Sequence, residues 1–138
     1  MLPAPSPAYA ALILRLALGV MYLAHSVILK LVVFTLPGTA QFFAGLGLPA
    51  ASAYLVFAAE AVGGALLVLG IGTRYVALAL IPVLLGAAWV HAGNGWVFSA
   101  PNGGWEYPAF LIVASLALAA LDDGAHALRL GRAASRDG

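Results

Sequence analysis

The chain has 138 residues, of which 64% are hydrophobic and only 8% are charged, and its formal net charge is +1. A soluble domain carries roughly 25% charged residues, so this composition and a mean hydropathy of +1.04 indicate an integral membrane protein. The sequence contains no cysteine and no basic stripe. These absences exclude disulfides, thiol catalysis and cysteine-ligated iron–sulfur clusters, and they argue against binding to nucleic acid.

Four apolar segments approach the roughly 20 residues that a membrane-spanning helix needs. Barrel strands are not predicted, because the segments lack two-residue alternation. The predicted fold is therefore all-α, a four-transmembrane-helix antiparallel bundle forming one domain over residues 1–138, with a polar tail over 122–138. Residues 1–8 contain no Lys or Arg, so the first segment is expected to be a retained helix rather than a cleaved signal peptide. The expected helices cover residues 8–34, 51–69, 74–91 and 107–121.

The connections between these helices carry recognisable start and stop signals. Gly70 to Arg74 predicts a tight turn with a glycine end and a Thr73 cap, which makes the second and third helices a hairpin. Pro82 predicts a kink in the third helix. Residues 36–49 are expected to form a short interfacial helix.

The distribution of basic residues predicts the topology. Arg74 and the three arginines of the tail, Arg129, Arg132 and Arg136, fall on one side of a four-helix bundle, whereas Lys30 alone falls near the other. We therefore expect both termini to be cytoplasmic, in the plasma (inner) membrane of a bacterium-like cell. Four aromatic residues then collect at the outer interface as a belt: Trp89, Trp96, Trp105 and Tyr107.

Glu60 is the most informative residue, because it is the only charge in the apolar run from Ala50 to Ile71. Ionisable residues inside a membrane usually face a bundle interior or a water-filled cavity. At about 100° per residue, Arg15, Tyr22 and Ser26 share one face of the first helix, with His25 and Lys30 flanking it on opposite sides. We predict an internal polar column formed by Arg15, Tyr22, His25 and Glu60, which opens outward to Lys30, His91, Asn94 and Glu106.

Structural roles for the same residues stay open. Arg15 and Glu60 could form an ion pair that fixes helix register, and Lys30 could extend to the lipid headgroups. His91 at an interface is more often a satisfied polar residue than a ligand. A metal site is not predicted, because the histidines and glutamates lack local ligand spacing.

Several short motifs occur together in a particular order. The sequence contains YLAHS at 22–26 followed by LKL at 29–31, FFAGLGLP at 42–49, AEAVGG at 59–64, GIGTR at 70–74, HAGNGW at 91–96 and GGWEYP at 103–108. In this order and spacing the chain resembles the DoxX family of small four-helix membrane proteins, over about residues 12–128. Two departures are visible. Ser26 stands where the family usually has glycine, and residues 125–128 replace its frequent serine-leucine-aspartate ending.

The resemblance implies a link to membrane redox complexes, because some members of the family are subunits of such complexes, including one that passes electrons from thiosulfate to quinone. From the polar column we predict a quinone-interacting subunit that receives electrons from a protein partner and carries no covalent cofactor. Glu60 and His25 are the predicted catalytic residues. The predicted quinone-binding residues are Arg15, Tyr22, Lys30, His91, Asn94 and Glu106. The alternatives are a non-catalytic scaffold that recruits a partner enzyme and, third, a small-solute or proton pathway; each allows a homo-oligomer.

Overall fold

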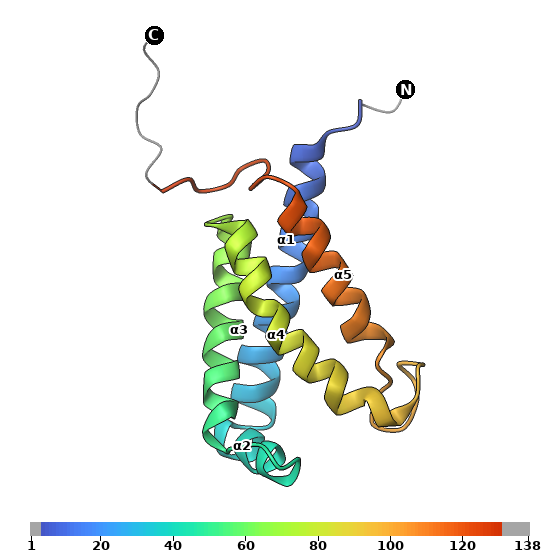
Figure 1. Ribbon diagram of the computed structural model, residues 1–138. Helices are drawn as coiled ribbons and strands as arrows, with labels where there is room; N and C mark the ends of the chain where they lie inside the picture. Colours follow the sequence, from blue (N-terminus) through green and yellow to red (C-terminus); the bar gives the residue numbers. More distant parts are fainter. Residues whose placement is uncertain (1–3, 131–138) are drawn as a thin grey trace.

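The computed structural model describes residues 4–130, and these residues form helices and connections without any strand (Figure 1). The predicted all-α class is therefore confirmed. The elements in chain order are α1 (Pro7–Leu23), the π-helix η1 (Ala24–Val33), α2 (Leu36–Gly45), α3 (Ala51–Leu69), α4 (Thr73–His91), the short 3₁₀-helix η2 (Ala92–Asn94) and α5 (Glu106–Ala120).

Three helices within the described residues are long and apolar enough to cross a membrane. These are α1 with η1 as one continuous stretch, α3, and α4 with η2. The fourth helix of the bundle, α5, is equally apolar but has only 15 residues. Neighbouring helices pack as α1 with α3, α3 with α4, α4 with α5, and α5 with α1. The result is a closed antiparallel ring of four helices.

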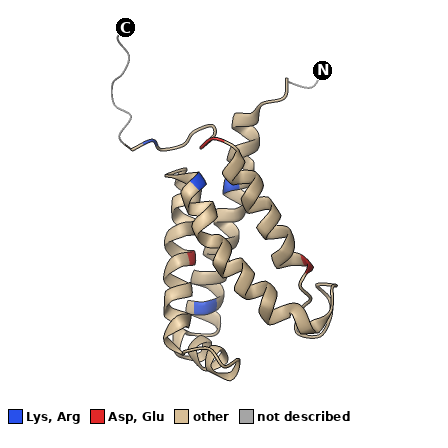
Figure 2. Ribbon diagram, in the orientation of Figure 1, with Lys and Arg blue, Asp and Glu red and all other residues tan. Residues whose placement is uncertain are grey.

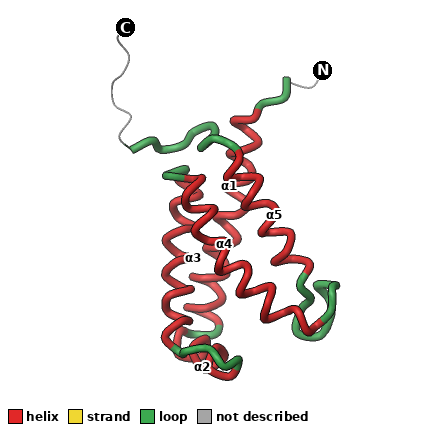
Figure 3. The backbone as a smooth tube through the Cα atoms, in the orientation of Figure 1, coloured by secondary structure: helices red, strands yellow, loops and turns green. Residues whose placement is uncertain are grey.

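The connections gather at the two ends of the bundle (Figure 3). We call one end the terminal end; it holds the start of α1, the turn between α3 and α4, and residues 121–130. The other, the loop end, holds α2 and the connection from η2 to α5. Lys, Arg, Asp and Glu are sparse along the helices and gather mainly at the terminal end (Figure 2).

Glycines set the close contact between α1 and α3. A Cβ atom at Gly19 would lie 2.9 Å from the carbonyl oxygen of Gly64, and one at Gly64 would lie 2.9 Å from that of Gly19. Gly63, one position along, faces α4, where a Cβ would meet Leu80 at 2.7 Å. Small residues let helices approach this closely, as expected for membrane helix packing. Adjacent glycines thus hold α3 tightly against two neighbours.

The observed connections between helices agree in part with those predicted from the sequence. Gly70 ends α3 in the left-handed conformation, with φ of 76°, and α2 forms where an interfacial helix was predicted. The Thr73 cap is wrong, because Gly72 is the cap residue and the Thr73 amide donates instead to Asp123 Oδ1 at 3.2 Å. α4 continues without a break through Pro82.

The described part of the predicted polar tail is also different from expectation. Residues 121–130 pack back on the helix ends, where Ala125 N donates to Ala8 O and Leu128 N donates to Leu69 O, both at 3.0 Å. The remainder of that tail, with Arg132 and Arg136, lies outside the described residues. Residues 121–130 therefore close the terminal end of the bundle.

Candidate functional site: a buried Lys–Glu pair in a π-helical segment

The first membrane helix changes its hydrogen-bonding pattern at Ala24. From there to Val33 it is a π-helix of 10 residues, and the Phe34 amide closes it by donating to Leu29 O at 2.8 Å, five residues back. π-Helices occur mostly as single turns and frequently at functional sites. The wider turn means that 100° per residue no longer describes the faces beyond Leu23. The predicted placement of His25 and Lys30 on opposite sides was based on that angle.

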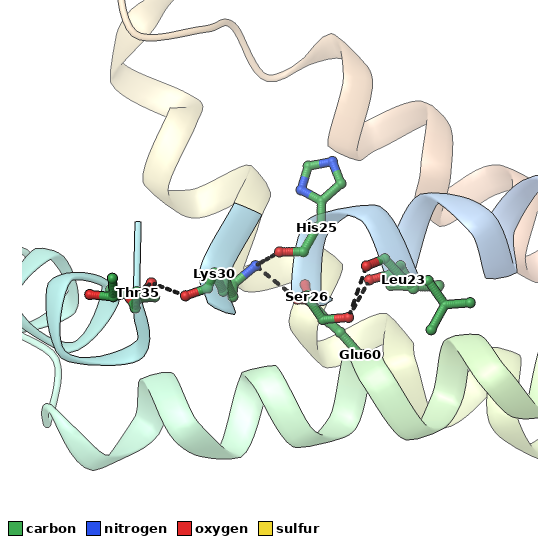
Figure 4. A network of polar contacts seen from close by, with 8 residues as sticks. Leu23, His25, Ser26, Lys30, Thr35 and Glu60 are labelled. Atoms are coloured by element: carbon green, nitrogen blue, oxygen red, sulfur yellow. Dashed lines mark hydrogen bonds and ion pairs between the residues drawn. The ribbon is translucent and has the colours of Figure 1, made fainter. Parts of the chain in front are cut away.

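Lys30 turns toward α3 and forms an ion pair with Glu60, with 2.8 Å between Nζ and Oε2 (Figure 4). The side chains are only 15% and 8% exposed. Glu60 is the tenth of the 19 residues of α3, so each end of the helix is about 14 Å away along its axis at about 1.5 Å per residue. Lys30 therefore does not extend to the headgroups. The pair lies near the middle of the predicted span.

The pair does not use its full hydrogen-bonding capacity. Lys30 Nζ has one further contact, with His25 O at 3.5 Å, and Glu60 Oε1 receives no hydrogen bond from the described residues. An ammonium group has three donors and a carboxylate has about four acceptor positions. A ligand could therefore accept a hydrogen bond from Lys30, or donate one to Glu60, without breaking the ion pair.

Two buried hydroxyls lie in the same part of the interior. Tyr22 of α1 and Ser115 of α5 are each 1% exposed. Their hydroxyl groups are neighbours, but neither makes a well-formed hydrogen bond with any described residue. Tyr22 lies near both Ser115 and Glu60. Buried polar atoms without partners are rare and call for an explanation, which a bound water or ligand would give.

His25 and Ser26 begin the π-helical segment. The His25 ring points away from Glu60, while its main-chain carbonyl faces Lys30 (Figure 4). Ser26 is fully buried, and its hydroxyl donates to Tyr22 O at 2.8 Å and has a longer contact with Leu23 O at 3.3 Å. The side chain that replaces the family's glycine is thus accommodated, and it bonds the carbonyls where the helix changes type.

Arg15 is not a partner of Glu60, so the ion pair considered from the sequence is wrong. Its guanidinium donates to four main-chain oxygens at the terminal end. The acceptors are Leu67 O (3.1 Å), Val68 O (2.7 Å), Asp123 O (3.1 Å) and Ala125 O (2.7 Å). Leu67 and Val68 are among the last residues of α3, where carbonyls lack the usual helical partner, and Leu67 O also accepts from Gly70 N at 3.2 Å. Arg15 therefore joins α1 to the end of α3 and to the segment after α5.

The outer polar residues form a third, separate cluster at the loop end. His91 Nδ1 contacts Asn102 O at 3.0 Å and Gly103 O at 3.2 Å, and the Asn94 amide donates to the same two oxygens. Glu106 Oε1 accepts from Phe98 N at 2.9 Å. No hydrogen bond or ion pair in the described chain links this cluster to Lys30 or Glu60. The single polar column predicted from the sequence is three clusters.

These clusters do not converge on a metal site. Within residues 4–130, no group of three or more His, Asp or Glu side chains is arranged to hold a metal ion.

Three features of these sites were not predicted from the sequence. Lys30 was not paired with Glu60, although Lys30 is the only lysine in the chain and Glu60 the only carboxylate within the predicted membrane spans. The fact that each residue is the only one of its kind there could have indicated the pairing. No sequence feature indicated the roles of Ser115 and Asp123, because an isolated serine in an apolar helix and an aspartate after the helix are common.

The chain belongs to the DoxX family, whose family model matches residues 10–93, more than half of the sequence. It is also similar to a Bacillus subtilis (strain 168) protein named "Putative oxidoreductase CatD", with 38% identity over 77 residues. That match covers 55% of this chain and 54% of the relative, so the chain spans about half the length of the curated relative it matches. No solved structure matches the chain. The protein is therefore a DoxX-family membrane protein.

Proposed function

We propose that this protein is the quinone-interacting membrane subunit of a redox complex, with its site at Lys30 and Glu60. The observation that carries the proposal is their buried ion pair, which lies near mid-span and keeps unused donors and acceptors. Charged side chains in that position are costly, and in membrane proteins they commonly mark substrate or proton pathways. The name of the Bacillus subtilis relative adds support for redox chemistry.

The chemistry follows from what a quinone needs. Reduction to a quinol consumes two electrons and two protons, and the electrons would come from an oxidoreductase partner. Lys30 would donate a hydrogen bond to one quinone oxygen as negative charge develops there. Glu60, which is a carboxylate while it pairs with Lys30, would first take up a proton from the water side and then deliver it to that oxygen. The apolar helix faces around the pair would receive the isoprenoid tail.

His25 and Tyr22 complete the proposed site. The His25 ring points away from Glu60, which suits a donor to the second quinone oxygen or an entry point for protons. The free Tyr22 hydroxyl is available to orient the ring. Arg15 falls outside the proposed site, because its donors are engaged with main-chain carbonyls at the terminal end. His91, Asn94 and Glu106 fall outside it as well.

The proposed location is the inner membrane of a bacterium, with the terminal end cytoplasmic. Arg74 and Arg129 both lie at that end, whereas Lys30 is held inside by Glu60. The positive-inside bias is therefore sharper than the sequence count suggests.

The test is mass spectrometry of protein purified in mild detergent, with small molecules and co-purifying proteins identified together. Wild type would be compared with Glu60→Gln, and with Asp122→Asn as a control carboxylate that is 76% exposed at the terminal end. We expect quinone in wild type and in Asp122→Asn, and its loss in Glu60→Gln. Equal quinone in all three samples, or none in any, would contradict the proposal.

A scaffold that holds a partner enzyme is the second candidate. It is favoured by the fact that Lys30 and Glu60 satisfy each other's charge, as a purely structural pair would. In that case a stoichiometric protein partner would co-purify without quinone, and Glu60→Gln would lower stability while leaving the partner bound. A proton pathway along the whole column is less well supported, because Arg15 is engaged at a different level of the bundle.

A further inference from the structure

A groove with a cavity volume of about 840 Å³ opens at the loop end, apart from the Lys30–Glu60 pair. It lies between the connection that follows η2 and the first two turns of α5. Cavities of roughly 300–1,000 Å³ are typical of sites for small molecules. The side chains that give it its character are His91, Trp96, Phe98, Glu106, Tyr107 and Phe110.

Main-chain contacts build this groove. Trp105 N donates to Gly95 O and Glu106 N donates to Trp96 O, both at 3.1 Å. The chain can close in this way only because Gly104 has no side chain, since a Cβ there would collide with the carbonyl oxygens of Trp96 and Val97. The rings of Trp96 and Trp105 then meet edge to face, with centroids 4.4 Å apart. The aromatic wall is thus held in place by the backbone.

The carboxylate of the groove keeps a free acceptor. Glu106 uses Oε1 to accept from Phe98 N, and Oε2 receives no hydrogen bond from the described residues. His91 Nδ1 faces the carbonyl oxygens of Asn102 and Gly103 and the side-chain amide of Asn94, so that side of the ring is engaged with the loop. No Lys or Arg lines the groove. A carboxylate among aromatic rings, with no cation nearby, is the arrangement that binds organic ammonium groups.

We propose that this groove is a binding site for a small organic ammonium compound with an apolar substituent. The ammonium group lies against Glu106 and the faces of the aromatic side chains, while the substituent lies along Phe110 and the apolar start of α5. The site is independent of the proposed quinone chemistry, since no contact joins the two sites within the described chain. An anionic lipid or a phosphate ester does not fit, because the lining offers no cation.

The test uses benzyltrimethylammonium as the probe and the full chain in nanodiscs, with binding followed by tryptophan fluorescence. The neutral hydrocarbon of the same shape, neopentylbenzene, separates charge recognition from apolar binding, and empty nanodiscs correct for partitioning. We expect saturable binding of the ammonium probe at least about tenfold tighter than that of the hydrocarbon, a difference of about 1.4 kcal/mol.

Two variants and one control locate the site. Glu106→Gln keeps an oxygen that accepts from Phe98 N but removes the charge, so the loop should stay folded while affinity for the probe falls about tenfold. Phe98→Ala should weaken binding about threefold through loss of one aromatic ring. Asp122→Asn removes a carboxylate at the other end and should bind as wild type does.

Unchanged affinity in Glu106→Gln, or equal binding of the charged and neutral probes, would overturn the proposal. So would the absence of saturable binding to wild type, which would leave a basic segment of a partner protein as the better candidate for this groove. Because none of these readouts involves quinone, failure here is distinguishable from failure of the proposed function.

Discussion

Arg15 and Lys30 are basic residues of the same membrane-spanning stretch, yet their hydrogen-bond partners are of different kinds. Arg15 gives hydrogen bonds to four carbonyl oxygens from two segments, and among residues 4–130 its charge meets no carboxylate side chain within hydrogen-bond distance. Lys30 meets a carboxylate and keeps spare donors, in a helix of unusual geometry. A buried charge that is fully bonded to main chain stabilises the fold. One with free bonding capacity beside orphaned hydroxyls is a candidate for chemistry.

The largest effect is expected from Arg15→Met. This substitution removes the donor from the carbonyls of Val68, Asp123 and Ala125, while Leu67 O keeps the Gly70 amide, and each buried unsatisfied group costs about 1–3 kcal/mol. We expect a loss of about 4 kcal/mol in the free energy of unfolding, measured by denaturant titration in detergent micelles. Arg15→Lys should recover only part of it, because an ammonium cannot reach four acceptors in a planar fork. An Arg15→Met protein as stable as wild type would contradict the structural role assigned to Arg15, and with it the difference between Arg15 and Lys30.

The second prediction concerns the ion pair itself. Lys30→Met and Glu60→Gln each leave one group buried without its partner, at a cost of about 3 kcal/mol. The double variant removes both charges and should be more stable than either single variant. The measurement is a double-mutant cycle on unfolding, with quinone content determined in the same samples.

The cycle separates structure from function. If the double variant recovers stability but contains no quinone, the pair is needed for binding beyond its role in packing. Recovery of both stability and quinone content would assign the pair to structure alone and contradict the proposed site.

A smaller effect is expected at the crossing of α1 and α3. Gly64→Ala places a Cβ 2.9 Å from Gly19 O, and overpacking of this kind costs about 1–3 kcal/mol. Gly86→Ala in α4 is the matched control, because a Cβ there meets nothing within 4 Å. It should be neutral or slightly stabilising in the same unfolding measurement. Equal destabilisation by both changes would show that close approach at Gly64 is not what holds these helices together.

The smallest effect is expected from Asp123→Ala, which removes the acceptor for the first amide of α4. Loss of a helix cap costs about 1 kcal/mol. Thermal unfolding should show a slightly lower midpoint. Arg74→Gln, a change at the same turn, should have a smaller effect, since no hydrogen bond or ion pair of Arg74 occurs among residues 4–130.

The sequence predicted the helices well because membrane spans are defined by composition and length. It predicted Glu60 as a buried residue on a packed face for the same reason, since a single charge stands out in an apolar run. The partner of Glu60 could not be predicted from helical periodicity, because that periodicity changes at Ala24. The role of residues 121–130 was missed because main-chain acceptors leave no mark in the sequence. Arg15 was therefore assigned to the wrong partner.

The position of Arg15 and Lys30 in the first hydrophobic stretch has a consequence for biosynthesis. When residues 7–33 leave the ribosome, Glu60 and the carbonyls of Leu67 and Val68 have not yet emerged from it. The stretch therefore enters the bilayer with both basic side chains uncompensated, and a charge at the centre of a lone membrane helix costs up to about 2.5–3.5 kcal/mol. We expect the first helix to become more stable in the membrane once α3 arrives and supplies these partners.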